Sequence, residues 1–408
     1  MITDVLGQIL ALGGLIVISL IIKRFLRLEL SLSCLLTGFL AGITLQFIDF
    51  DTGIRAHNLQ DLVFFLVLPV LIFEAAWAIQ PKLLKQWLIP VMLLAIPGVL
   101  IGASIMAALI YYGIGHPSGF PWIAAFLAGT ILAATDPIAV INQLHEMKAP
   151  DGLTTLFEGE SLFNDASVIV LFAIVIGVAT GEMQQEQNPV GLFVRVFFGG
   201  AAFGLLGGLL TSTIIVLINS SSASRLLLLL SAFSSFYLAE HHLHVSGIMA
   251  VTLCALTTRI LLRRFEETLA SGIAETWDWL GLFFNALLFV VMGLVITPDM
   301  FSHQWLAILI AIVAALIARA LSVAVCGAAT IPLPRAIPFA WQCLLVSGGL
   351  RGAIAIALVL SLPVSLSYWW TIQSMVFGVV IFGMLVQGTT NKWVASRLLQ
   401  TDKATSEH

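Results

Sequence analysis

The sequence predicts an all-α polytopic membrane protein of about 13 transmembrane helices. Three observations carry this prediction. The 408 residues are 60% hydrophobic and only 10% charged, whereas soluble domains carry about 25% charged residues. The apolar residues gather into segments of about 20, the length that crosses a bilayer. Two of these segments are interrupted by proline or glycine beside charged residues, which predicts helices broken at mid-membrane.

The apolar segments follow one another with short polar connections. They centre on residues 5–22, 28–48, 61–80, 87–112, 121–144, 153–180, 190–218, 225–240, 245–262, 277–297, 304–328, 336–361 and 369–391. The first segment is not a signal peptide, because its positive residues follow it and no small-residue cleavage site is apparent. The composition leaves no basic patch for nucleic acid. The four cysteines are interpreted as small apolar core residues.

The charges between segments predict the orientation, since Lys and Arg accumulate in cytoplasmic loops. One set of alternate connections, together with the end of the chain, holds Lys23, Arg24, Arg27, Lys82, Lys85, Lys148, Arg225, Arg259, Arg263, Arg264, Arg335, Lys392, Arg397 and Lys403. The opposite set holds Arg55 alone. We therefore expect a cell (inner) membrane protein with its N-terminus outside and its C-terminus in the cytoplasm, which requires an odd number of spans.

The segment 121–144 contains Thr135, Asp136 and Pro137 at its centre. Proline lacks an amide hydrogen and disfavours the α conformation of the residue before it. Asp caps helix N-termini, and Pro suits the first helical position. One helix is thus predicted to end and a second to begin inside the membrane, where freed carbonyls and helix ends can bind a cation. The alternative is a simple proline kink with a capping Asp.

The segment 153–180 carries several acids on one predicted helix. At about 100° per residue, Glu158, Ser161 and Asp165 share a face, and Glu160 and Asn164 lie on an adjoining face. An ionised carboxylate in hydrocarbon is costly, so these residues are predicted to be functional and not ordinary charges at the membrane edge. One face offers oxygen ligands, and the other offers a structural acid.

The segment 336–361 is the second predicted break. Arg351 lies among Gly348, Gly349 and Gly352, and glycines in a membrane helix permit unwinding. A buried guanidinium requires an acid, and Glu160 is the predicted partner.

The two interrupted segments each lie second in a triplet of spans, a pattern that indicates a transporter built of inverted repeats. Two other arginines inside segments, Arg195 and Arg319, are expected to snorkel towards a membrane surface.

Three further features stand out, and the first two have competing interpretations. Glu74 lies inside the apolar segment 61–80, either as a functional acid or as a residue reaching the cytoplasmic surface. A cluster of Glu240, His241, His242 and His244 at an outer loop is either a solvated loop or a metal or pH site. A ladder of Gly200, Gly204 and Gly208 predicts close packing of two helices.

Three motifs resemble the monovalent cation:proton antiporters of the sodium/proton exchanger type, in the NhaP-like branch. They are ATDPIAV at 134–140, FEGESLFNDA at 157–166 and GGLRGAIAIAL at 348–358. The resemblance covers nearly the whole chain. It implies two inverted six-helix repeats plus one helix, within a single transporter domain over 1–398. It also implies a core bundle over about 87–180 and 304–391, a dimerising scaffold over about 5–80 and 190–297, and a short cytoplasmic tail at 399–408.

The resemblance also implies roles for single residues. Asp165 would carry the cation or the proton, with Asn164, Ser161 and Thr135 as further ligands and Glu74 as a scaffold acid along the ion path. Glu160 and Arg351 would form a structural ion pair. Asp136, next to Pro137 at the helix crossing, is expected to neutralise helix N-termini and not to bind the ion. Asn164 before Asp165, in place of a second Asp, resembles the electroneutral members.

The expected function is exchange of a monovalent cation, Na⁺ before Li⁺ or K⁺, for H⁺ by alternating access, in a homodimer without a cofactor. A K⁺/H⁺ antiporter of the same fold is the alternative. An uncoupled cation channel is a second rival and would conduct without counter-movement of protons. An intramembrane hydrolase is a third, but the sequence lacks an HExxH, GxGD or GxSxG arrangement, so no enzyme activity is expected.

Overall fold

Helices account for the regular structure, as the apolar segments predict. The computed structural model describes residues 2–26, 28–47, 63–115, 120–181, 188–263 and 272–406, and these ranges contain no strand. The helices are α1 (Ile2–Leu26), α2 (Leu30–Phe47), α4 (Leu68–Ala78), α5 (Pro81–Ala95), α6 (Pro97–Ile114), α7 (Trp122–Ala133), α8 (Ile138–Glu146), α9 (Asp151–Thr180), α10 (Pro189–Ile218), α11 (Ser221–Tyr237), α12 (Gly247–Leu262), α14 (Ile273–Val295), α15 (Pro298–Thr330), α16 (Phe339–Ser347), α17 (Ala353–Leu360), α18 (Trp369–Phe382) and α19 (Gly388–Ser406). Three π-helical turns are η1 (Val63–Val67), η2 (Leu238–Leu243) and η4 (Gly383–Gln387).

The apolar helices coincide with the predicted segments. Within the described residues, eight stretches are long and apolar enough to cross a membrane, and three shorter apolar helices lie in α2, α4 and α12. α1 and the α16–α17 pair occupy the two remaining predicted positions. The total of thirteen spans and the orientation stay predictions. Among the charges used for the orientation, Arg27, Arg55 and Arg264 lie outside the described residues, as does the side chain of Lys403.

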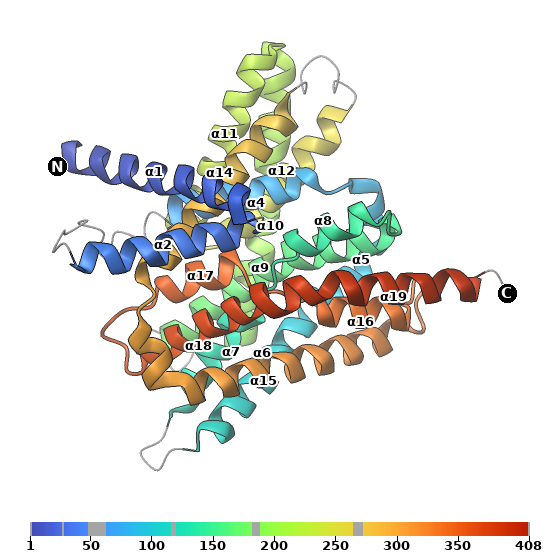
Figure 1. The fold of residues 1–408 in the computed structure, drawn as a ribbon. Coiled ribbons are helices and arrows are strands. Elements are labelled where there is room, and N and C mark those ends of the chain that lie inside the picture. Colours follow the sequence, from blue (N-terminus) through green and yellow to red (C-terminus); the bar gives the residue numbers. More distant parts are fainter. Residues whose placement is uncertain are drawn as a thin grey trace.

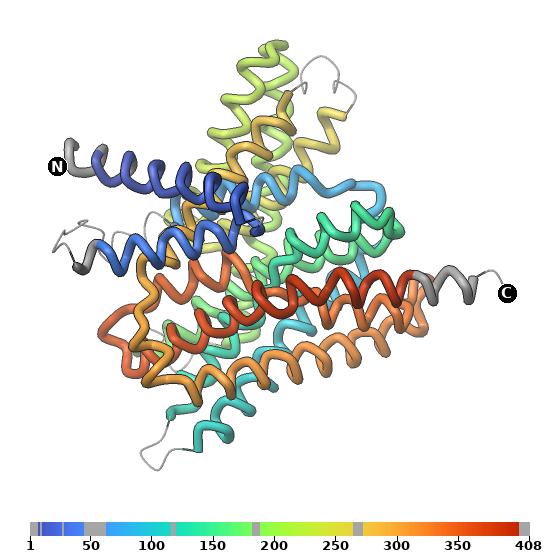
Figure 2. The backbone as a smooth tube through the Cα atoms, in the orientation of Figure 1, coloured from blue at the N-terminus to red at the C-terminus, as the bar shows by residue number. Residues whose placement is uncertain are grey.

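The helices pack as two groups with α9 between them (Figure 1). In one group α6 packs on α7 and α15, and α15 packs on α18. In the other, α10 packs on α12, and α14 packs on α2 and α4. The tube in Figure 2 shows α1 and α2 in blue, side by side at the edge of this second group. α9 contacts α5 and α7 on one side and α10 and α12 on the other, so residues on α9 face both groups. The division into a moving core and a dimerising scaffold stays a prediction.

The glycine ladder of α10 permits its close contact with α12. A Cβ at Gly208 would lie 2.8 Å from the carbonyl oxygen of Cys254, and Gly204 faces the carbonyl of Ala250 in the same way. Without side chains the two backbones approach directly, and the resulting van der Waals packing contributes to the association of helices in lipid. The predicted packing role of the ladder is confirmed.

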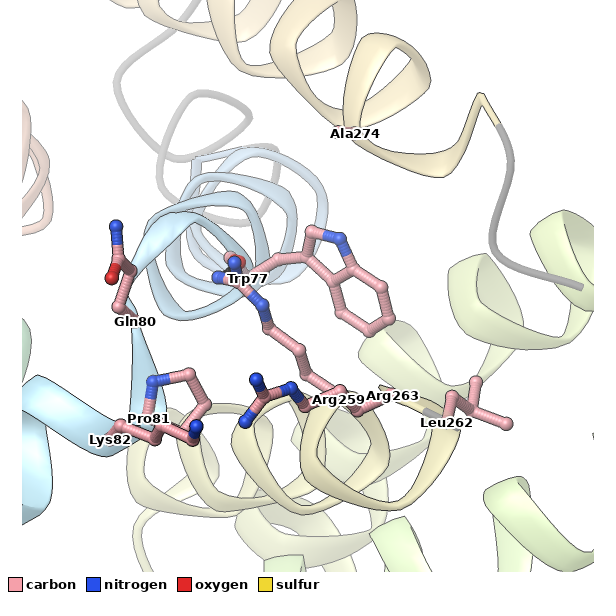
Figure 3. Close-up of a pocket in the computed structure, with 8 residues that line it drawn as sticks. All are labelled: Trp77, Gln80, Pro81, Lys82, Arg259, Leu262, Arg263 and Ala274. Atoms are coloured by element: carbon pink, nitrogen blue, oxygen red, sulfur yellow. Dashed lines mark hydrogen bonds between the residues drawn. The ribbon is translucent and has the colours of Figure 1, made fainter. Parts of the chain in front are cut away.

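The connection from α4 to α5 links the two groups and is fastened by one arginine. Arg259 of α12 donates to the carbonyl oxygen of Ile79 at 2.6 Å and to that of Trp77. These carbonyls belong to the end of α4, where an arginine satisfies acceptors that the helix leaves unpaired. A cavity of about 300 Å³ lies beside this contact. Figure 3 shows Arg259, Trp77 and Lys82 among the residues that line it. Arg259 thus holds the second group to the segment that leads into the first.

The end of the chain is helical beyond the last predicted apolar segment. The last apolar segment is expected to end near residue 391 and to be followed by a short tail at 399–408. In the structure η4 is followed directly by α19, which continues to Ser406. A helix can continue beyond the membrane, so the short cytoplasmic tail at 399–408 stays a prediction.

Candidate functional site

The predicted break in the first interrupted helix is present. α7 ends at Ala133 and α8 begins at Ile138. The residues between them are extended or irregular, because Pro137 cannot donate to the preceding turn. The second interrupted helix breaks in the same manner between α16 and α17. The two breaks touch directly, since the amide of Asp136 donates to the carbonyl oxygen of Leu350 at 2.8 Å. The crossing of two broken helices is therefore confirmed.

The first break meets the acidic face of α9. The hydroxyl of Ser161 donates to the carbonyl oxygen of Thr135 at 2.9 Å. The side-chain amide of Asn164 donates to the hydroxyl of Thr135 at 2.8 Å. Thr135 and Asn164 are both buried, and the amide oxygen of Asn164 has no hydrogen-bond partner within the described part of the chain. The structure thus brings together three of the residues predicted to surround Asp165.

Asp165 faces a cavity of about 460 Å³ that lies between α9, the two breaks and the helices α4 and α14. Ser161 and Thr135 line the same cavity, and Glu74 lines it from α4. Among the residues the structure describes, none forms a hydrogen bond with the carboxylate of Asp165. A half-buried carboxylate without a hydrogen-bond partner among the described residues, in a cavity that Ser161 and Thr135 also line, can hold either a proton or a cation.

Two opposite charges neutralise the four helix ends at the crossing. The carboxylate of Asp136 accepts from the amide of Ile138 at 3.1 Å and from that of Ala353 at 3.4 Å, the first residues of α8 and α17. The guanidinium of Arg351 donates to the carbonyl of Leu132 at 2.8 Å and to that of Gly349, near the ends of α7 and α16. Helix N-termini attract negative charge and C-termini attract positive charge. Asp136 therefore has the expected place, and Arg351 is its counterpart.

The predicted ion pair between Glu160 and Arg351 is wrong. Glu160 pairs with Arg319 of α15, whose two terminal nitrogens reach both carboxylate oxygens, one of them at 2.9 Å. Arg319 also donates to the carbonyl of Leu345 from Nε at 3.1 Å and from Nη2 at 2.9 Å. The expectation that Arg319 snorkels to a surface is wrong as well, because its side chain is only 9% exposed. Arg351 is engaged by helix C-termini and needs no acid of its own.

Sequence reasoning misassigned Arg319 and missed two residues that line the cavity. Arg319 could have been recognised by its position, since it lies about 16 Å of helix from Thr330, too far to snorkel. Asp278 and Asn285 of α14 line the same cavity as Asp165. Their spacing of seven puts them on one helix face, which was a usable signal.

The Glu240–His244 cluster belongs to a helix cap. The carboxylate of Glu240 accepts from the amide of Gly247, the first residue of α12, at 2.8 Å. His241 and His242 both pack against the ring of Tyr237. The acid thus satisfies a helix end, and two of the three histidines pack on an aromatic ring.

The chain is similar to proteins of known activity. The family model described as "Sodium/hydrogen exchanger, transmembrane" matches residues 12–397. The Na⁺/H⁺ antiporter ApNhaP of Aphanothece halophytica is 34% identical over 369 residues, which are 88% of this chain and 68% of that protein. The Na⁺/H⁺ antiporter NhaH of Halobacillus aidingensis is 30% identical over 405 residues, covering 97% of this chain and 98% of that one. The solved structure of the sodium proton antiporter MjNhaP1 from Methanocaldococcus jannaschii has the same fold, with a TM-score of 0.83 at 21% identity over 97% of this chain and 99% of that one.

Proposed function

The chain belongs to the sodium/hydrogen exchanger family and is a cation/proton antiporter, and we propose that it exchanges Na⁺ for H⁺ at the single carboxylate of Asp165. One observation carries this proposal. Asp165 faces a cavity together with the oxygens of Ser161 and Thr135, and it has no hydrogen-bond partner among the described residues. The choice of Na⁺ rests on the sodium antiporters to which the chain is similar.

The oxygens around Asp165 suit a small hard cation. Alkali ions prefer carboxylate, hydroxyl and carbonyl oxygens over nitrogen or sulfur ligands. Asp165 would supply the charged ligand, and Ser161 and Thr135 would supply neutral ones. Asn164 would hold Thr135 in place through its hydrogen bond, at 2.8 Å. Glu74 lines the same cavity from α4, and we propose that its carboxylate faces the bound ion.

Coupling follows from competition for one carboxylate. A proton on Asp165 removes the charge that attracts the cation, and a bound cation displaces the proton. If the empty carboxylate does not cross the membrane, each passage carries one ion or the other, and the result is antiport. We propose that the group containing α5–α9 and α15–α19 carries the site past the remaining helices in an alternating-access cycle, within a homodimer in the cell membrane.

The charges near the site favour electroneutral exchange. Asn164 is neutral, Arg319 balances Glu160, and Arg351 balances Asp136. One proton would then exchange for one cation, and no net charge would move. A membrane potential does work of about 2.3 kcal/mol per moved elementary charge per 100 mV, so exchange in proteoliposomes should not respond to a potential imposed with valinomycin. Rates that change strongly with that potential would reject the one-to-one ratio. Glu74→Gln would then show whether Glu74 carries a second proton.

The function is tested by dequenching of a pH-sensitive dye in proteoliposomes on addition of Na⁺, Li⁺ or K⁺ in turn. The wild-type protein should respond to Na⁺, and Asp165→Asn should not respond to any of the three. A response to K⁺ alone would favour the K⁺/H⁺ alternative. Cation flux without movement of protons would identify an uncoupled channel.

A further inference from the structure

The carboxylate of Glu74 lies against bare helix backbone. Gly281 of α14 is buried and faces α4, and a Cβ placed on it would lie 2.9 Å from both Cγ and Cδ of Glu74 and 3.1 Å from Oε2. Real Cβ atoms essentially never approach another heavy atom more closely than 3.0 Å. Glu74 can therefore occupy its position only because residue 281 has no side chain.

Gly281 differs from the glycines that allow helices to touch. A Cβ at Gly293, the other of the two glycines of α14, would lie 2.7 Å from the backbone nitrogen of Phe39 in α2. The three atoms nearest to a Cβ at Gly281 all belong to the side chain of Glu74. The space at Gly281 thus accommodates one carboxylate and not a neighbouring helix.

The face of α14 that contains Gly281 lies along the cavity that holds Asp165. Asp278, Gly281 and Asn285 are three and seven residues apart, so they share one face of α14. Asp278 and Asn285 line the cavity that also holds Glu74 and Asp165. The side-chain oxygen of Asn285 is buried and has no hydrogen-bond partner among the described residues. A carboxylate pushed away from Gly281 would therefore move within the cavity that leads to Asp165.

We propose that Gly281 is a positioning residue for Glu74, and that through Glu74 it sets the apparent affinity of the antiporter for its cation. The inference rests on the proposed function, in which Glu74 faces the ion bound at Asp165. Gly281 touches no ion itself. Its contribution is the absence of a side chain at the point where the carboxylate of Glu74 lies.

The test is Gly281→Ala, reconstituted in proteoliposomes and assayed across a range of Na⁺ concentrations. The Cβ should displace the carboxylate and raise the apparent KM for Na⁺ by roughly threefold to tenfold, a factor of ten being about 1.4 kcal/mol. The maximal rate should change much less. Gly207→Ala is the matched control on α10, because its Cβ would meet only ordinary contacts at 3.4 and 3.8 Å, and its KM should equal that of the wild type. An unchanged KM for Gly281→Ala would overturn the proposal.

Two further measurements separate positioning from a structural role. Ala favours a helix over Gly, and the displaced atoms are the end of a flexible side chain, so Gly281→Ala should melt no lower than the wild type. A lowered melting temperature, or failure to fold, would identify Gly281 as a packing residue and overturn the proposal. Glu74→Asp shortens the side chain by one methylene and so leaves room for a Cβ at residue 281. The double variant Glu74→Asp, Gly281→Ala should therefore have nearly the same KM as Glu74→Asp alone. Additive effects of the two substitutions would also overturn it.

Glu74→Ala distinguishes failure of this inference from failure of the proposed function. In that background no carboxylate remains to be displaced, so adding Gly281→Ala should leave KM unchanged. If Glu74→Ala raises KM and Gly281→Ala does not, Gly281 has no positioning role while the role of Glu74 stands. If Glu74→Ala leaves KM unchanged, the place of Glu74 in the proposed function is wrong, and the present inference is overturned with it.

Discussion

Removal of either partner of the Glu160–Arg319 pair should destabilise the protein strongly. Glu160 is 2% exposed and Arg319 is 9% exposed. Each carboxylate oxygen accepts from one terminal nitrogen of the guanidinium, and Arg319 also donates twice to the carbonyl of Leu345. Loss of one partner leaves a buried charge without compensation, which costs about 3–5 kcal/mol. At about 2 °C per kcal/mol, Arg319→Ala should lower the melting temperature by roughly 6–10 °C.

The assay is thermal unfolding of detergent-solubilised protein, followed by tryptophan fluorescence. Lys392 and Glu146 provide the control, because their charges also lie 2.9 Å apart but the side chains are 61% and 65% exposed. An exposed pair contributes about 0–1 kcal/mol, so Lys392→Ala should shift the melting temperature by roughly 2 °C or less. Glu160→Gln should cost much less in the Arg319→Ala background than in the wild type. A stronger coupling of Glu160 to Arg351 than to Arg319 would refute the assignment.

Substitutions at Asp165, Asp136 and Gly204 also have definite expected outcomes. Asp165→Asn should abolish dye dequenching while the protein still folds, because an amide cannot alternate between proton and cation; Asp165→Glu should retain some activity with altered cation affinity. Asp136→Asn should lower the melting temperature, since two helix N-termini lose their negative charge; an unchanged value would contradict that role. Gly204→Leu should reduce the yield of folded protein, whereas Gly207→Ala on the same helix should not, and equal yields would show that the Ala250 contact is unimportant.

Hydropathy and proline placement predicted most of the helical framework because both act locally. A run of about 20 apolar residues has few alternatives to a spanning helix. Pro137 and the glycines around Arg351 interrupt a helix wherever it lies. The breaks at 134–137 and 348–352 were therefore predictable from the chain alone.

The partner of Glu160 was not predictable in the same way. Two buried arginines lie within reach of the breaks, and only the packing of α15 against α16 brings Arg319 to the carboxylate. Arg351 donates to backbone carbonyls at helix ends. Every residue has such a carbonyl, so the sequence does not show which of them accept a hydrogen bond from the arginine. The space at Gly281 likewise depends on how α4 packs against α14. It could not be predicted from the sequence of either helix by itself.

Competition between a proton and a cation for Asp165 is most directly tested by proton release. Na⁺ is added to weakly buffered, detergent-solubilised protein, and the pH change is recorded beside an independent measurement of Na⁺ binding. The wild-type protein should release up to one proton per chain as Na⁺ binds, and Asp165→Asn should release none. Na⁺ binding to the wild type without proton release, or equal release from Asp165→Asn, would contradict exchange at this carboxylate.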